Sequence, residues 1–184
     1  TGTVSSEVVG LGAGFLMIGY GINTLSPKLA GKLQVSMTVI KLVPLILMAV
    51  VGIIVGLVSE NGVLMENLAY AGAETSGNPL FGAVVATSFA YEGWIIATSI
   101  NAELKDAKKN LPIALITGGI IIVAIYLFYY IGVAGGATVE TLIHDGATVA
   151  YTNVFGTAFG NILNVFVAIS CMGTLNGLML GCTR

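Results

Sequence analysis

The sequence has very little charge for its length. Of its 184 residues, 9% are charged and 56% are hydrophobic. A water-soluble domain has about 25% charged residues, so this chain has too few to cover a surface exposed to water. We therefore expect its surroundings to be lipid. The same scarcity excludes a disordered tail, and it excludes a nucleic-acid-binding protein, which needs a basic face.

Cysteine is also scarce. The two cysteines, Cys171 and Cys182, fall in one apolar stretch, eleven residues apart. On a helix that spacing is roughly 16 Å of rise, whereas a disulfide needs Cα atoms within about 7 Å. We predict no disulfide between them within that helix, and a secreted disulfide scaffold is excluded.

A secretory signal is missing as well. The first hydrophobic stretch has no basic segment before it, and the chain opens with Thr1 rather than Met. We therefore expect no signal peptide, and we interpret the sequence as a piece of a longer protein.

Long apolar runs, in contrast, are abundant. One membrane crossing needs about 20 mostly apolar residues, and the chain offers five such stretches, at 8–27, 34–58, 79–100, 112–134 and 156–181. The sequence therefore predicts an all-α integral membrane protein with five transmembrane helices in a single domain, 1–184.

The charged residues outside these spans predict the orientation. On one side of the membrane lie basic residues, namely Lys28, Lys32, Lys105, Lys108, Lys109 and Arg184. The other side has acidic residues and no Lys or Arg: Glu7, Glu60, Glu66, Glu74, Glu140 and Asp145. By the positive-inside rule, the basic loops are cytoplasmic. Tyr129 and Tyr130 then suit the outer aromatic belt, and His144 is expected to be a solvated loop residue.

Two ionisable residues, Lys41 and Glu92, lie inside predicted spans. Such residues are costly at membrane depth and are functional candidates for that reason. Lys41 is about seven residues into its span, roughly 10 Å of rise, so one alternative is that its ammonium group snorkels to the interface. Pro44, three residues on, indicates a local bend and argues against an ordinary lipid-facing position.

The middle of the third span is unusual. It places hydroxyls, aromatic rings, a carboxylate and a glycine where leucine and isoleucine are normal: Ser88, Phe89, Ala90, Tyr91, Glu92 and Gly93. Gly93 costs about 1 kcal/mol of helix propensity. A helix broken at this depth is tolerated where its backbone lines a cavity or binds a ligand. The alternative is a continuous helix in which Gly93 packs against a neighbour.

Glu92 has more than one interpretation. At the start of a half-helix its carboxylate could serve as a cap. Desolvation disfavours its charged form, so it could also take up a proton. An ion pair with Lys41 is a third possibility, for which the sequence gives no distance.

The fifth span has small and hydroxyl residues along one stripe. They recur at three- and four-residue spacings: Ser170, Gly173, Thr174, Gly177 and Gly181. Helix packing accounts for the glycines. The hydroxyls of Ser170 and Thr174, one turn apart, could also bind a cation or a lysine ammonium group.

Three stretches, 22–45, 89–115 and 169–184, resemble the amino acid–polyamine–organocation (APC) superfamily of transporters. The most specific part is Phe89 to Pro112, where a polybasic loop ending in KKNLP follows an aromatic-x-Gly helix. Members usually have twelve helices, of which the first ten form two inverted repeats, the LeuT-like fold. The five spans resemble helices four to eight. The resemblance therefore implies a fragment that holds part of a site and works only with the remaining helices of the same transporter.

The resemblance also implies roles for residues. The unwound centre of the family's sixth helix corresponds to Ser88, Phe89, Ala90, Tyr91, Glu92 and Gly93, which meet the substrate. Phe89 matches an aromatic that closes over the substrate, and Gly93 matches the glycine that makes room for it. Lys41 aligns with a lysine that stands in for a sodium ion, and Ser170 and Thr174 match the opposite side of that location. Glu92 departs from the family pattern, in which an apolar or small residue is common.

The function implied is an amino acid carrier of the plasma membrane that works by alternating access. It would be sodium-independent and either an exchanger or a proton-coupled symporter. Glu92 leaves a cationic amino acid or polyamine open as substrate. From another class, a channel or structural membrane subunit remains, although Phe89 and Tyr91 at the break disfavour a pore. The sequence has no metal cluster or nucleophile–base pair, so we predict no enzyme activity, no cofactor and no metal.

Overall fold

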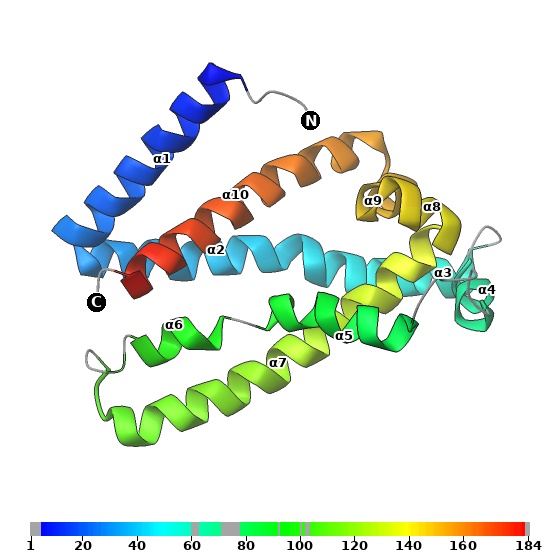
Figure 1. The fold of residues 1–184 in the computed structure, drawn as a ribbon. Coiled ribbons are helices and arrows are strands. Elements are labelled where there is room, and N and C mark those ends of the chain that lie inside the picture. The colour runs from blue at the N-terminus through cyan, green and yellow to red at the C-terminus, as the bar shows by residue number, and fades with distance from the viewer. Residues whose placement is uncertain are drawn as a thin grey trace.

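The structure is a computed structural model, and it describes residues 5–59, 63–70, 78–91, 93–99, 101 and 104–182. The side chains of Pro27, Pro79, Phe89 and Ala90 are outside this description. Within the described part every regular element is a helix (Figure 1). In chain order they are α1 (Ser6–Leu25), α2 (Pro27–Leu47), the π-helix η1 (Met48–Gly52), α3 (Ile53–Val58), α4 (Leu64–Ala69), α5 (Pro79–Ala90), α6 (Trp94–Ser99), α7 (Ala107–Gly136), α8 (Val139–Asp145), α9 (Ala147–Phe155) and α10 (Thr157–Cys182).

Four helices in the described part are long and apolar enough to cross a membrane. They are Ser6–Leu25, Lys28–Val58, Ala107–Gly136 and Thr157–Cys182. They overlap the predicted spans at 8–27, 34–58, 112–134 and 156–181. The remaining predicted span, 79–100, is divided between α5 and α6, of 12 and 6 residues, so neither half is long enough to cross alone.

Local sequence explains several helix ends. Asn78 caps α5, because its side-chain oxygen accepts the N–H groups of Leu80 at 3.1 Å and Phe81 at 3.4 Å. Gly146, before α9, and Gly156, after it, have φ of 68° and 87°, which other residues rarely adopt. These two glycines allow the chain to fold α8 and α9 into a compact pair before α10 begins (Figure 1).

Asn67 ties α4 to the end of α7. Its Nδ2 donates to the carbonyls of Ala134 at 2.6 Å and Ala137 at 2.8 Å. Its Oδ1 accepts the N–H of Val139 at 3.1 Å. One amide therefore satisfies backbone groups at the end of α7 and the start of α8 that have no intrahelical partner.

The α2–α3 segment packs against α7 through glycines. A Cβ atom at Gly56 would lie 2.6 Å from the Cα of Gly135, and one at Gly52 or Gly132 would overlap the backbone of the opposite helix. In lipid the hydrophobic effect does little to bring helices together, so their association depends on van der Waals packing. Glycines allow the close backbone contact that this packing needs. Position 52 and position 132 therefore accept only glycine without rearrangement.

The second main contact is between α2 and α10, which run antiparallel (Figure 1). The Cβ position of Gly173 lies 3.3 Å from the Cβ of Met37, and that of Gly177 lies 3.3 Å from Nε2 of Gln34. The small residues of the fifth predicted span thus receive the longer side chains of α2, as the packing interpretation proposed.

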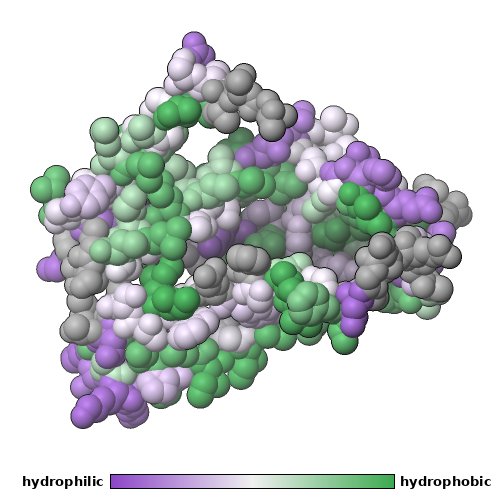
Figure 2. Space-filling model, viewed as in Figure 1, coloured by the Kyte–Doolittle hydropathy of each residue, from purple (hydrophilic) through white to green (hydrophobic). Residues whose placement is uncertain are grey.

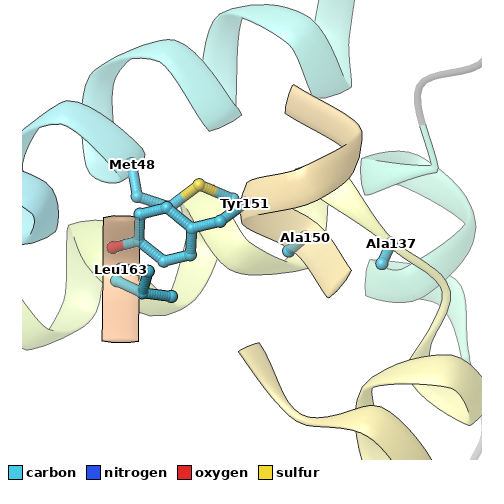
Figure 3. Close-up of a cluster of buried hydrophobic side chains, with 5 residues drawn as sticks. All are labelled: Met48, Ala137, Ala150, Tyr151 and Leu163. Atoms are coloured by element: carbon cyan, nitrogen blue, oxygen red, sulfur yellow. The ribbon is translucent and has the colours of Figure 1, made fainter. Parts of the chain in front are cut away.

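The buried apolar core is small and lies where η1, α9 and α10 meet. Its members are Met48, Ala137, Ala150, Tyr151 and Leu163 (Figure 3). Large hydrophobic side chains are exposed elsewhere, for example Met17 at 74% and Leu25 at 87%. Figure 2 shows hydrophobic side chains along the helices and hydrophilic ones mostly toward their ends. This distribution fits a protein whose outer surface meets lipid.

Candidate functional site

The chain is interrupted between α5 and α6, within the predicted third span. Helix α5 ends at Ala90, Tyr91 and Gly93 are in turns, and α6 begins at Trp94. The N–H of Tyr91 bonds to the carbonyl of Ser88 at 3.3 Å, and that of Ile96 bonds to the carbonyl of Gly93 at 3.2 Å. Both are i to i−3 contacts, so the α-helical pattern of bonds ends at Tyr91 and starts again after Gly93 in the described part, as it does at the two ends of a helix, where backbone groups lack intrahelical partners.

Two contacts hold this interruption against the bundle. The ring of Tyr91 packs edge-on against Tyr126 of α7, with centroids 5.7 Å apart and planes at 89°. On the other side, Ile96 lies 3.6 Å from the Cβ position of Gly181 in α10. No described heavy atom lies within 4 Å of the Cβ position of Gly93. The alternative in which Gly93 packs against a neighbour therefore has no support in the described part.

The other predicted residues of the interruption are only partly described. The hydroxyl of Ser88 donates to the carbonyl of Val85 at 2.7 Å, within its own helix. For Phe89 and Ala90 the backbone is described and the side chains are not. Glu92 lies outside the described residues, so its capping, proton-binding and ion-pair interpretations stay predictions.

Lys41 lines a cavity of about 160 Å³ within the bundle. The cavity is formed by α2, α7, α9 and α10, and its walls are Lys41, Pro44, Leu45, Tyr129, Tyr151, Leu163, Phe166, Val167 and Ser170. Lys41 is half-buried there. Its side chain makes no hydrogen bond or ion pair with the described residues, and the cavity suits an ammonium group with a few water molecules. This position argues against a lysine that merely snorkels along lipid.

The structure places Ser170 and Thr174 in different surroundings. Ser170 lines the Lys41 cavity from α10. Thr174 is exposed, is not part of the cavity wall, and its hydroxyl donates to the carbonyl of Ser170 at 3.1 Å. The structure therefore brings Lys41 and Ser170 to one cavity and leaves Thr174 beside it.

Sequence reasoning missed two tyrosines of this cavity. Tyr129 was predicted for the outer aromatic belt, but it faces the cavity and packs against the buried core. Tyr130 is 75% exposed, as a belt residue would be. Tyr151 lies in a stretch predicted to be a loop, yet it is 1% exposed and reaches the cavity from α9. Hydropathy does not distinguish a tyrosine that faces lipid from one that faces a neighbouring helix, which explains the miss at Tyr129. Tyr151 was missed because α9, of 9 residues, is too short to be found as a membrane span.

A buried amide network crosses the same helix interface nearer the start of α2. Nδ2 of Asn23 donates to Oδ1 of Asn176 at 3.0 Å, and Nδ2 of Asn176 donates to Oε1 of Gln34 at 2.9 Å. Asn176 also bonds to the carbonyl of Ala30 at 3.2 Å. The network joins α1, α2 and α10, and it fixes the register of α2 on α10 that places Lys41 and Ser170 on the wall of one cavity.

The two cysteines of α10 are free and exposed, so no disulfide joins Cys171 and Cys182. His144 is exposed near the end of α8.

Comparison with known proteins gives a consistent result. Residues 2–184 match the family model described as Amino acid permease. The chain is 31% identical over 188 residues to the serine/threonine exchanger SteT of Bacillus subtilis (strain 168), with 100% of this chain and 40% of that protein covered. It is 31% identical over 175 residues to the b(0,+)-type amino acid transporter 1 of Oryctolagus cuniculus, covering 91% of this chain and 34% of that protein.

A more distant relative is the human cystine/glutamate transporter, 24% identical over 166 residues, with 89% of this chain and 32% of that protein covered. No solved structure gives a significant match. The chain thus spans between 32% and 40% of the length of these relatives. All of them are transporters rather than enzymes. Because the family match covers almost the whole chain, this chain belongs to the amino acid permease family of integral, multi-pass membrane transporters.

Proposed function

We propose that this chain is part of a secondary transporter that moves amino acids across the plasma membrane by alternating access. The transporter is sodium-independent and works as an exchanger or as a proton-coupled symporter. The family and the names of the relatives, a serine/threonine exchanger and a cystine/glutamate transporter among them, support this class of substrate.

The observation that carries the proposal is the interruption between α5 and α6. Free carbonyls at the end of one half-helix attract an ammonium group, and free N–H groups at the start of the next attract a carboxylate. An amino acid carries both groups. In our proposal the substrate is held by the segment from Ser88 to Gly93, with Phe89 closing over it, Gly93 making room, and Ala90, Tyr91 and Glu92 contributing the rest of the wall.

The Lys41 cavity supports the absence of sodium coupling. An ammonium group fixed between α2 and α10 supplies the positive charge that a bound sodium ion would supply, with Ser170 across the cavity and Thr174 beside it. In our proposal this charge helps to hold the helices in one arrangement, and binding of substrate shifts the balance between outward-open and inward-open states. The remaining helices of the transporter complete the site.

The test is uptake of radiolabelled amino acids into proteoliposomes that hold the complete permease. Serine, glutamate, arginine and putrescine are compared, with sodium or potassium as the external cation. We expect saturable uptake of an amino acid that is unchanged when potassium replaces sodium. We also expect a stimulation of about tenfold or more, a change of ~1.4 kcal/mol in barrier, by the unlabelled amino acid inside or by an inward proton gradient.

Empty liposomes and a variant with Gly93→Val serve as controls, because a Cβ branch at the interruption fills the space meant for substrate. A flux that does not saturate with substrate concentration, and that neither internal unlabelled amino acid nor an inward proton gradient stimulates, would indicate a channel. Uptake that requires sodium would remove the proposed role of Lys41, and uptake of putrescine alone would move the substrate class to polyamines.

A further inference from the structure

Tyr151 is the largest fully buried side chain of the described part and comes from α9, which is too short to cross a membrane. Its ring lies between Met48 of η1 and Leu163 of α10 (Figure 3). It is also parallel to the ring of Phe159, at an angle of 4° with centroids 6.4 Å apart. The ring is therefore fixed by apolar contacts on several sides, which leaves its hydroxyl group little freedom.

That hydroxyl group donates a hydrogen bond to the carbonyl of Pro44 at 2.9 Å. Pro44 sits inside α2, where its ring removes one backbone donor, and helices commonly kink at such a position. The π-helix η1 begins four residues later, at Met48. The carbonyl of Pro44 also accepts the N–H of Met48 within the helix. The bond from Tyr151 is therefore a second contact on this carbonyl, made from another helix at the junction of α2 and η1, where prolines and π-turns commonly bend helices.

Pro44 is also close to Lys41. The two residues are three apart, nearly one helical turn, and both line the same cavity with Tyr151. The direction of α2 at Pro44 therefore determines where the stem of Lys41 starts relative to Ser170 on α10. A change in the bend would move the ammonium group and open or close the cavity wall beside it.

We propose that Tyr151 is a positioning residue for Lys41: by holding the carbonyl of Pro44, it sets the bend of α2 and closes the Lys41 cavity on the α9 side. This inference deepens the proposed function, because the importance of Lys41 for transport rests on that proposal. It also assigns α9, outside the spanning helices, a part in the cavity.

The test uses Tyr151→Phe in the complete permease, purified and placed in nanodiscs. Phenylalanine keeps the ring and its stacking and removes only the hydroxyl group. In a background without other cysteines, Cys171 and Cys182 included, Lys41→Cys reports on the cavity through its rate of reaction with a positively charged methanethiosulfonate reagent. We expect Tyr151→Phe to raise this rate about fivefold or more, because it removes the bond to the carbonyl of Pro44 together with the contact between the hydroxyl groups of Tyr151 and Tyr129. In the permease that retains Lys41, we expect kcat of uptake to fall by a similar factor while KM stays the same.

Two controls separate position from packing. Tyr130→Phe removes a hydroxyl group from an exposed tyrosine of α7 and should leave the labelling rate and uptake as they were. Phe159→Leu weakens the stack on Tyr151 but keeps its hydroxyl, and should lower the unfolding temperature while changing the labelling rate much less than Tyr151→Phe does.

The proposal is overturned if Tyr151→Phe leaves the labelling rate at position 41 unchanged, even when the variant is less stable. It is overturned equally if Phe159→Leu changes the rate as much as Tyr151→Phe does, since the hydrogen bond would then not be the cause. The labelling experiment does not depend on transport. If a variant without Lys41 transported normally, the proposed role of Lys41 in transport would be refuted. The labelling rates would still show whether Tyr151 controls access to position 41.

Discussion

Lys41 places a positive charge inside the helix bundle, where it is expensive. It is half-buried on α2, on the wall of the cavity shared with α7, α9 and α10, and within the described residues it has no ion pair or hydrogen bond to offset its desolvation. A leucine or methionine at this position would stabilise the helix interface better. The cost therefore points to a role for the charge itself, and the neighbouring Ser170 and two tyrosines give the cavity the polarity that such a charge needs.

We expect Lys41→Met in the complete permease to lower the rate of uptake about tenfold or more, ~1.4 kcal/mol in barrier. Methionine keeps an unbranched apolar stem of similar length and removes only the charge, so membrane insertion and the amount of protein should not change. The measurement is initial uptake per amount of purified protein in proteoliposomes. Lys32→Met, which removes an exposed charge earlier in the same helix, is the matched control and should transport normally. Equal uptake by the two variants would reduce Lys41 to a packing residue.

At the scale of elements, the sequence predicted what depends on apolar length and missed what depends on contacts between helices. The spans follow from hydropathy alone, and the interruption follows from the polar and glycine content of 88–93. In contrast, η1, α8 and α9 left no periodic signal, because they are short and are held by the Tyr151 hydroxyl and the Asn67 amide. Pro44 indicated a bend, but the sequence could not show that the Tyr151 hydroxyl bonds to its carbonyl.

The glycine contact between the α2–α3 segment and α7 gives a prediction at this scale. A side chain at Gly132 would overlap the backbone around Met48, so Gly132→Val forces the two helices apart. We expect the apparent Tm of the purified permease to fall by roughly 5 °C or more, as overpacking of a tight interface does.

The matched control is Gly118→Val in the same helix, where no described heavy atom lies within 4 Å of the Cβ position. It should leave the Tm within about 1 °C, because valine is a somewhat better helix former than glycine. Thermal unfolding followed by intrinsic fluorescence measures both variants, and an equal change in the two would contradict the close packing of α7 on α2–α3.

At the scale of the whole molecule, charge separates along the direction of the helices. The starts of α2 and α7 and the end of α10 gather at one end of the bundle, and α4 and α8 lie at the other (Figure 1). The first end holds the described lysines that lie outside the spans predicted from sequence, Lys28, Lys32, Lys105, Lys108 and Lys109, together with Asp106, whereas Glu66 and Glu140 belong to the second end. The fold therefore groups the charges in the way that the positive-inside rule requires for one defined orientation.

The orientation itself is the last prediction. In a cysteine-free permease, we expect Glu140→Cys to react with a membrane-impermeant maleimide in intact cells, because the acidic end faces outward. Lys108→Cys should react only after the membrane is permeabilised, and Lys32→Cys should behave in the same way, since both residues are exposed at the basic end. If Lys32→Cys and Lys108→Cys react in intact cells and Glu140→Cys does not, the orientation is the reverse of the predicted one. Different behaviour of Lys32→Cys and Lys108→Cys would place the starts of α2 and α7 on opposite sides, which requires that α5 and α6 together do not cross the membrane. The experiment thus also tests whether the interrupted pair of helices forms a complete span, as the proposed substrate site demands.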